Sequence, residues 1–173
     1  MIKQGLKSVI LIGMPGTGKS TVGVLLAKEL GLDFVDTDIL IQLREHKSLQ
    51  DIIDDAGYIE LRKIEEQVLL ENDYSSKAVA TGGSAIYSEK AMVKLAQVGQ
   101  VIYLSCSLDE LQSRIGNYRS RGIAASVGQQ IGDLAKERTV LYEQYADFTV
   151  DTSSKAPAQV VEEILNYLQI NHA

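Results

Sequence analysis

Short runs with apolar centres alternate along the chain with longer segments whose apolar residues recur at helical spacing. The short runs predict strands at residues 8–12, 33–36, 78–81, 100–104 and 148–151. The longer segments predict helices over residues 21–30, 88–96 and 129–145, and further helices that begin near residues 107 and 157. Where one of these begins, Ser107 and Glu110 have the spacing of a capping box. The alternation indicates an α/β protein with a parallel sheet and helices on both of its faces.

The connection between the second and third predicted strands is longer than a crossover needs. Residues 39–72 have a mainly helical pattern, and we expect this insertion to form a wall of a substrate site. Residues 116–128 contain three glycines and two arginines without periodicity, which predicts either a lid over a ligand or a surface loop. No repeat or linker divides the chain, so residues 1–173 are expected to form a single domain.

The composition argues against several classes of protein. A formal net charge of -6 without any basic cluster makes nucleic acid an unexpected partner. No stretch approaches the length of a membrane span, and the N-terminus lacks the apolar segment of a signal peptide, so we expect a cytoplasmic protein. Cys106 is the single cysteine, which rules out an internal disulfide and suits a reducing compartment. Because it follows an apolar run, we expect a buried and unreactive thiol.

The sequence between the first strand and the first helix matches a phosphate-binding pattern. Residues 13–20 read Gly-Met-Pro-Gly-Thr-Gly-Lys-Ser, which fits G-x-x-x-x-G-K-[ST] in its required context of strand and helix. Lys19 is expected to reach the β- and γ-phosphates of ATP, and Ser20 to place its hydroxyl on Mg²⁺. Glycine backbone and the helix N-terminus favour an anion at the same point. The expected nucleotide-binding residues are Gly13, Gly16, Thr17, Gly18, Lys19, Ser20 and Thr21.

Polar residues follow the second and third strands, where ligands of open α/β sheets bind. Asp36 and Asp38 end the second strand, and phosphoryl transfer needs one carboxylate to hold Mg²⁺ and one to orient the attacking hydroxyl. The alternative is that Asp38 only caps a helix beginning at Ile39. Gly82 and Gly83 follow the third strand and either allow close approach of a ligand or form a plain tight turn.

Two arginines have both a functional and an ordinary interpretation. Arg62 could form a surface salt bridge with Glu65 or Glu66, or it could bind a carboxylate of the acceptor in a forked arrangement. Arg138 lies on the helix after the expected lid, where it could face either the solvent or the substrate. Two converging arginines would favour an anionic acceptor, because without an anion they would repel each other.

Together these motifs resemble those of shikimate kinases, and the resemblance covers nearly the whole chain. The shared features, in order, are the P-loop, Asp-x-Asp, an arginine with a glutamate three residues later, the glycine pair, a lid arginine, and an arginine before Leu-Tyr. The resemblance implies a three-layer P-loop kinase fold whose five-stranded parallel sheet has the order 2-3-1-4-5. It also implies Mg²⁺-dependent phosphorylation of shikimate by ATP to give shikimate 3-phosphate.

The resemblance also implies roles for individual residues. Ser20 and Asp36 would hold Mg²⁺, and Asp38 would engage the acceptor hydroxyl. The rest of the acceptor would be bound by Arg62, Gly82, Gly83 and Arg138. Arg121 in the lid would act with Lys19 on the transferring phosphate, and Arg114 would lie near the adenine.

The chain departs from the family pattern at three places, all on the acceptor side. Tyr58 replaces a glutamate, Ser84 replaces a third glycine, and Gly-Ile-Ala at residues 122–124 replaces Pro-Leu-Leu, which predicts a looser lid. We expect a monomeric kinase for a small anionic alcohol. Two alternatives stay open: a related kinase acting on a different small hydroxylated carboxylate, and a nucleotide-binding regulatory module without turnover.

Overall fold

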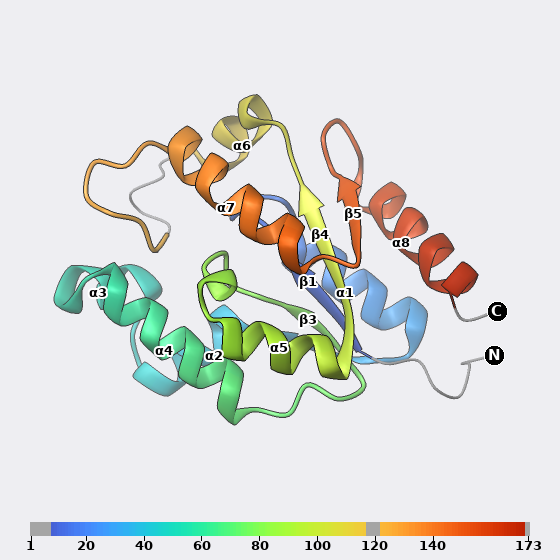
Figure 1. The fold of residues 1–173 in the computed structure, drawn as a ribbon, viewed down its shortest axis with the longest axis horizontal. Coiled ribbons are helices and arrows are strands. Elements are labelled where there is room, and N and C mark those ends of the chain that lie inside the picture. The colour runs from blue at the N-terminus through green and yellow to red at the C-terminus, as the bar shows by residue number, and fades with distance from the viewer. Residues whose placement is uncertain (1–7, 117–121, 172–173) are drawn as a thin grey trace.

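A sheet of parallel strands forms the centre of the molecule (Figure 1). The computed structural model describes residues 8–116 and 122–171. The strands are β1 (Ser8–Ile12), β2 (Asp33–Asp36), β3 (Lys77–Ala80), β4 (Gly99–Ser105) and β5 (Phe148–Asp151). Neighbouring strands are parallel, and their order is β2-β3-β1-β4-β5. The order expected from the resemblance is therefore confirmed.

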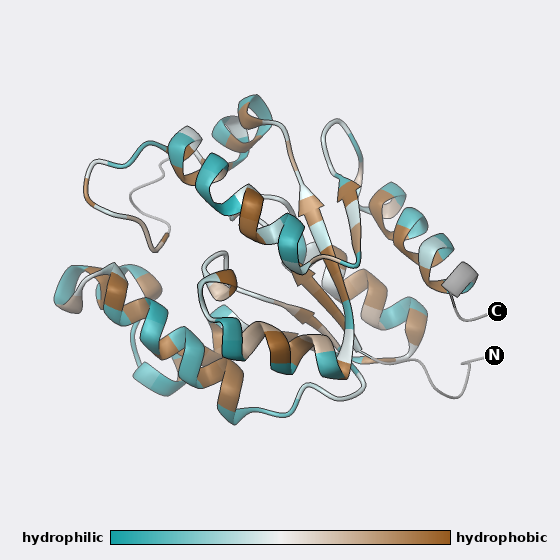
Figure 2. Ribbon diagram, viewed as in Figure 1, coloured by the Kyte–Doolittle hydropathy of each residue, from teal (hydrophilic) through white to brown (hydrophobic). Residues whose placement is uncertain are grey.

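Helices cover both faces of the sheet, which confirms the three-layer architecture (Figure 1). Along β1, Val9 and Leu11 contact one layer and Ile10 and Ile12 the other, because successive side chains of a strand point to opposite faces. On the Val9 face lie α1 (Lys19–Leu30) and α8 (Pro157–Asn171), and on the Ile10 face lie α5 (Glu89–Val98) and α7 (Ile131–Tyr145). Figure 2 shows hydrophobic residues along the central strands and both kinds of residue on the helices.

The insertion between β2 and β3 consists of α2 (Thr37–Glu45), α3 (Leu49–Ala56) and α4 (Tyr58–Glu71). Their apolar sides form a separate cluster that includes Ile41, Ile52 and Leu61. Ala124, from the segment expected to form a lid, is buried in the same cluster. The insertion and the part of the lid segment that the structure describes are therefore packed together.

Helix α2 begins at Thr37, two residues earlier than the predicted insertion. Its N-cap is Asp36, whose carboxylate accepts a hydrogen bond from the Asp38 backbone N–H at 3.0 Å. The alternative in which Asp38 caps a helix at Ile39 is therefore wrong. The cap lies two residues earlier, at Asp36, and Asp38 is part of the first turn of the helix.

Helix α6 (Leu108–Ile115) begins as predicted, but its capping differs. The Ser107 hydroxyl accepts from the Glu110 N–H at 3.4 Å, which is one half of the expected box. The Glu110 carboxylate turns to other partners: it accepts from the Ser154 N–H at 2.6 Å and pairs with Arg114 at 2.5 Å. The loop after β5 lies against α6, so these partners replace the return contact. 

The single cysteine lies just after β4. Cys106 is half-buried instead of fully buried. Burial nevertheless raises the pKa of its thiol, which favours the neutral form with low reactivity.

Among residues 8–116 and 122–171, no helix has the length and apolar character needed to cross a membrane.

The close approach of β4 to β1 gives a first testable prediction. A Cβ at Gly99 would lie 2.2 Å from the Ser8 carbonyl oxygen, and Ser8 is paired with Gly99 in the sheet. Gly99→Ala should therefore lower the free energy of unfolding by about 2 kcal/mol, because the backbone of β1 cannot shift without disturbing its pairing on both sides. Urea unfolding followed by circular dichroism measures the change.

Gly132→Ala is the matched control. On α7 the added methyl group would meet only the tip of Leu108, at 3.3 Å, and alanine favours a helix by roughly 0.5–1 kcal/mol. An equal loss of stability in both variants would contradict the prediction.

Candidate active site

The turn between β1 and α1 has the backbone geometry of a phosphate-binding loop. Gly13, Gly16 and Gly18 have φ angles of 146°, 87° and 94°, a region that residues with a Cβ rarely adopt. A Cβ at Gly13 would lie 2.5 Å from the Leu104 carbonyl oxygen, whereas nothing lies within 4 Å of one at Gly18. The N–H groups of this turn and of the first turn of α1 can therefore converge on an anion from the open side.

The polar side chains of the loop differ in where they point. Thr17 is 2% exposed, and its hydroxyl donates to the Met14 carbonyl oxygen at 2.9 Å. Its side chain thus stabilises the loop itself, which leaves its backbone as the part able to contact a ligand. Ser20 and Thr21 stand in the first turn of α1 and are exposed.

Lys19 is buried beneath the loop. Its ammonium group donates to the carbonyl oxygens of Gly13, at 2.7 Å, and Met14, at 2.9 Å. Burial lowers its pKa to about 8, and the carboxylates of Asp38 and Asp36 act in the opposite direction. The positive charge therefore lies between the loop and the two aspartates.

Ser20 and Asp36 have donor atoms that suit Mg²⁺. The Ser20 hydroxyl donates to Oδ2 of Asp36 at 2.5 Å, so two hard oxygen ligands stand side by side at the start of α1. Within residues 8–116 and 122–171, no three His, Cys, Asp or Glu side chains cluster as a metal site. A small number of protein ligands is typical of Mg²⁺, because this ion keeps several water ligands and takes others from the phosphates of the substrate.

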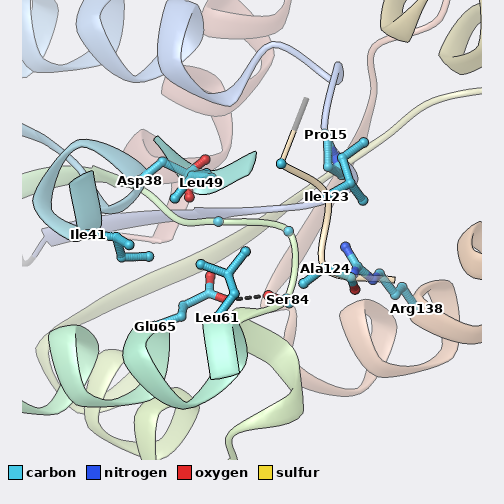
Figure 3. A pocket seen from close by; sticks show the side chains of 13 residues that line it. Pro15, Asp38, Ile41, Leu49, Leu61, Glu65, Ser84, Ile123, Ala124 and Arg138 are labelled. Carbon is cyan, nitrogen blue, oxygen red and sulfur yellow. Dashed lines mark hydrogen bonds between the residues drawn. The ribbon is translucent and has the colours of Figure 1, made fainter. Parts of the chain in front are cut away.

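A small cavity lies beside the loop (Figure 3). Its volume is about 50 Å³, and residues far apart in the sequence line it, among them Pro15, Asp38, Glu65, Gly83, Ile123 and Arg138. A water molecule needs about 10–15 Å³ by this measure, so the cavity holds only a few waters. A small carboxylic acid would have to displace the segment that contains Ile123 and Ala124.

Two carboxylates face this cavity close together. A Cβ at Gly82 would lie 2.2 Å from Oε1 of Glu65 and 2.7 Å from Oδ1 of Asp38, so only glycine fits between them and the strand end. The other oxygen of Glu65 accepts a hydrogen bond from the Ser84 hydroxyl, whereas Oε1 is buried without a partner. Burial raises the pKa of Asp38 to about 6, helped by Asp36, and that of Glu65 to about 7, helped by Asp38.

The two predicted substrate arginines converge on one backbone atom. Arg138 is 1% exposed and donates through Nη2 to the Ala124 carbonyl oxygen at 2.7 Å. Arg62 donates to the same oxygen at 3.2 Å, and the Nε atoms of both arginines are buried without a partner. The surface salt bridge considered for Arg62 and the solvent-facing position considered for Arg138 are therefore both wrong.

Arg62 does not line the 50 Å³ cavity itself. It lines an adjoining cavity of about 210 Å³, and Glu65 and Ser84 line both. Ala124 lies between the two arginines, so displacing it would bring both guanidinium groups to a single enlarged site. Asp38, Gly82, Gly83 and Arg138 therefore line one cavity, whereas Arg62 lines the adjoining one.

Aromatic rings flank the arginines. The guanidinium carbon of Arg62 lies 3.7 Å from the ring centroid of Tyr87 and 5.0 Å from that of Tyr58. Arg138 lies 5.5 Å from the Tyr87 centroid, so one ring stands near both cations. Tyr87 and the pairing of Glu65 with Ser84 were not predicted. Tyr87 follows the glycine pair at the end of β3 by a few residues, and this closeness in the sequence is the signal that could have identified it.

The remaining residues predicted to bind the nucleotide are Arg114 and Arg121. Arg114, at the end of α6, borders Gly16, whose added Cβ would lie 3.7 Å from the Arg114 Cβ. Its guanidinium donates to Glu110 at 2.5 Å and to the Thr152 carbonyl oxygen at 3.0 Å. Arg121 lies outside the described residues, so its role stays a prediction.

The fold and this site define a class of protein. A phosphate-binding loop, a parallel sheet of order 2-3-1-4-5 and a separate, charged acceptor pocket are the parts of a P-loop kinase for small molecules.

Comparison with known proteins narrows this class. The family model described as shikimate kinase matches residues 15–169. Shikimate kinase from Staphylococcus haemolyticus is 35% identical over 92% of this chain and 93% of that protein. The structure of shikimate kinase from Acinetobacter baumannii in complex with shikimate superposes with a TM-score of 0.86 at 31% identity, over 97% of this chain and 96% of that one. The chain belongs to the shikimate kinase family.

The buried Glu65 carboxyl predicts a dependence of stability on pH. Its pKa is about 7 in the folded protein and ordinarily near 4.5, so between these values the folded state retains a proton that the unfolded state loses. Stability therefore falls as the pH rises through this window, and glutamine avoids the loss. From pH 5 to pH 8, Glu65→Gln should gain on the order of 3 kcal/mol relative to the unmodified protein.

Urea unfolding at both pH values measures this shift. Glu60→Gln removes one charge from an exposed position on the same helix and is the matched control. If Glu65→Gln changes stability equally at pH 5 and pH 8, the carboxyl is not protonated in the folded state as described.

Proposed function

We propose that this chain transfers the γ-phosphoryl group of ATP to shikimate, with ADP and shikimate 3-phosphate as products. The observation that carries the proposal is the convergence of a phosphate-binding loop, the Asp38 carboxylate, the buried Arg138 and the half-buried Arg62 at one edge of the sheet. Membership of the shikimate kinase family and the likeness to a relative solved with shikimate support this acceptor.

On the nucleotide side, the loop would surround the phosphates with N–H groups, and Lys19 would pair with the β- and γ-phosphates. Ser20 and Asp36 would hold Mg²⁺, which supplies positive charge to the phosphate oxygens when bound. Arg121 would add charge from the lid, and Arg114 would border the adenine. The nucleotide-binding set is Gly13, Gly16, Thr17, Gly18, Lys19, Ser20, Thr21, Arg114 and Arg121.

On the acceptor side, Asp38 would orient the attacking hydroxyl and accept its proton as the oxygen bonds to the γ-phosphorus. Arg62 and Arg138 would bind the carboxylate in place of the Ala124 carbonyl oxygen. The backbone at Gly82 and Gly83 would lie against the ring. Because every one of these groups comes from one chain, we propose a monomer, and the use of ATP with a single unpaired cysteine suits the cytoplasm.

A direct assay tests the proposal. ADP release should require shikimate and should stop when EDTA removes Mg²⁺ and return when Mg²⁺ is added in excess. Turnover with another hydroxylated carboxylate, but not with shikimate, would select a related kinase. ATP binding without turnover on any acceptor would select a regulatory module.

Arg62, which the acceptor would contact in place of Ala124, gives a sharper test. Arg62→Ala should raise the KM for shikimate by about tenfold to a hundredfold, because a charge-assisted hydrogen bond contributes roughly 1.5–3 kcal/mol. The KM for ATP should stay the same, since Arg62 donates to Ala124 and the cavity that it lines includes no residue of the loop. Arg44→Ala is the matched control, because Arg44 pairs with Glu71 on the surface. Unaltered shikimate kinetics in Arg62→Ala would show that Arg62 does not bind the acceptor.

A further inference from the structure

Arg62 and Glu65 lie one turn apart on α4, yet they do not pair. Opposite charges at this spacing normally attract each other across a helix turn. Here the Nε atom of Arg62 and the Oε1 atom of Glu65 are both buried without a hydrogen-bond partner. Leaving two such atoms unpaired costs free energy, so other contacts must keep the two groups apart.

Residues that depart from the family pattern, together with Tyr87, provide these contacts. The Ser84 hydroxyl donates to Oε2 of Glu65, as the dashed line in Figure 3 shows. The Tyr87 ring lies against the guanidinium of Arg62 at 3.7 Å, with Tyr58 on it at 5.0 Å. Glu65 is thus held toward the strand end and Arg62 toward the tyrosines.

This separation leaves one oxygen of Glu65 free for a ligand. Oε1 of Glu65 and Oδ1 of Asp38 both lie against Gly82, 2.2 Å and 2.7 Å from its hypothetical Cβ, and both residues line the cavity of about 50 Å³. Above a pH of about 7 both carboxylates are ionised, and ionised carboxylate oxygens can only accept hydrogen bonds, so each requires a donor. Two adjacent oxygens of this kind match two adjacent hydroxyl groups on one acceptor.

We propose that Ser84 is a positioning residue that holds Glu65 as the binding group for the hydroxyl next to the one that is phosphorylated. The kinase thereby selects acceptors that carry two neighbouring hydroxyl groups. The inference rests on the proposed function and adds a selectivity determinant to it. A glycine at this position would release Oε2, and the carboxylate could then turn to Arg62 and leave the second hydroxyl without a partner.

Acceptors that lack one hydroxyl test the proposal within each variant. Shikimate is compared with 4-deoxyshikimate, which lacks the hydroxyl next to the phosphorylated position, and with 5-deoxyshikimate. The unmodified kinase should lose about tenfold in kcat/KM with the 4-deoxy acceptor, the loss expected for one hydrogen bond to a charged group. Ser84→Ala should lose about tenfold with shikimate and nothing further with 4-deoxyshikimate.

The variants separate positioning from a general structural effect. Ser84→Thr retains the hydroxyl and should retain the discrimination between shikimate and 4-deoxyshikimate. Ser88→Ala is the matched control: Ser88 is 8% exposed, Ser84 is 7% exposed, and Ser88 caps α5 instead of contacting Glu65. Because the two acceptors are compared with one enzyme sample, partial unfolding lowers both rates and leaves their ratio unchanged.

Distinct outcomes would overturn the inference. If Ser84→Ala lowers the rates with shikimate and 4-deoxyshikimate by the same factor, Ser84 acts only on the structure. If the discrimination is unchanged, or is lost for 5-deoxyshikimate instead, Glu65 does not bind the neighbouring hydroxyl. Absence of turnover of shikimate by the unmodified kinase would overturn the proposed function and this inference with it.

Discussion

The buried guanidinium of Arg138 is the constraint around which the acceptor site is arranged. A charge removed from water is costly unless hydrogen bonds or an opposite charge compensate it, yet no carboxylate of the described residues forms a salt bridge with Arg138. The Ala124 carbonyl oxygen and the nearby Tyr87 ring take that place. Gly83 must lack a side chain, because a Cβ would lie 2.8 Å from Nη1 of Arg138. Thus α7, the turn after β3 and the segment around Ala124 are fixed relative to one another by one cation.

The nucleotide half of the site is built on a different principle. Its geometry is local: the positive φ angles of Gly13, Gly16 and Gly18 and the start of α1 at Lys19 follow from residues adjacent in the sequence. Such a loop can be recognised from the sequence because spacing and conformation are tied together. The alternation of strands and helices predicted a parallel sheet with helices on both faces, and the resemblance to a family predicted the strand order. The positions of the strands could be predicted to within a residue at each end.

The acceptor half could be predicted only in part, because its contacts join residues far apart in the sequence. Asp38 and Arg138 were found through their motif context, but the choice between cap and ligand for Asp38 depended on α2 beginning at Thr37. Nothing in the local sequence indicates that Tyr87 stacks on Arg62, 25 positions earlier, at 3.7 Å. Ser84, in the turn after β3, was identified as a departure from the family pattern, but its partner Glu65 lies on α4. These contacts depend on side-chain packing between different elements, which the spacing of apolar residues in the sequence does not predict.

The closed arrangement also bears on how an acceptor enters. Ala124 offers a neutral carbonyl oxygen to Arg62 and Arg138, and a carboxylate would offer two charged oxygens to the same donors, which makes stronger hydrogen bonds. An anionic acceptor can therefore replace the backbone oxygen, whereas a neutral alcohol cannot compensate both guanidinium groups. Since the cavity of about 50 Å³ cannot hold a ring, this exchange must accompany movement of residues 122–124. Recognition of the carboxylate and opening of the site would then be a single event, because the arginines that we propose to bind the acceptor are those that hold the Ala124 carbonyl oxygen.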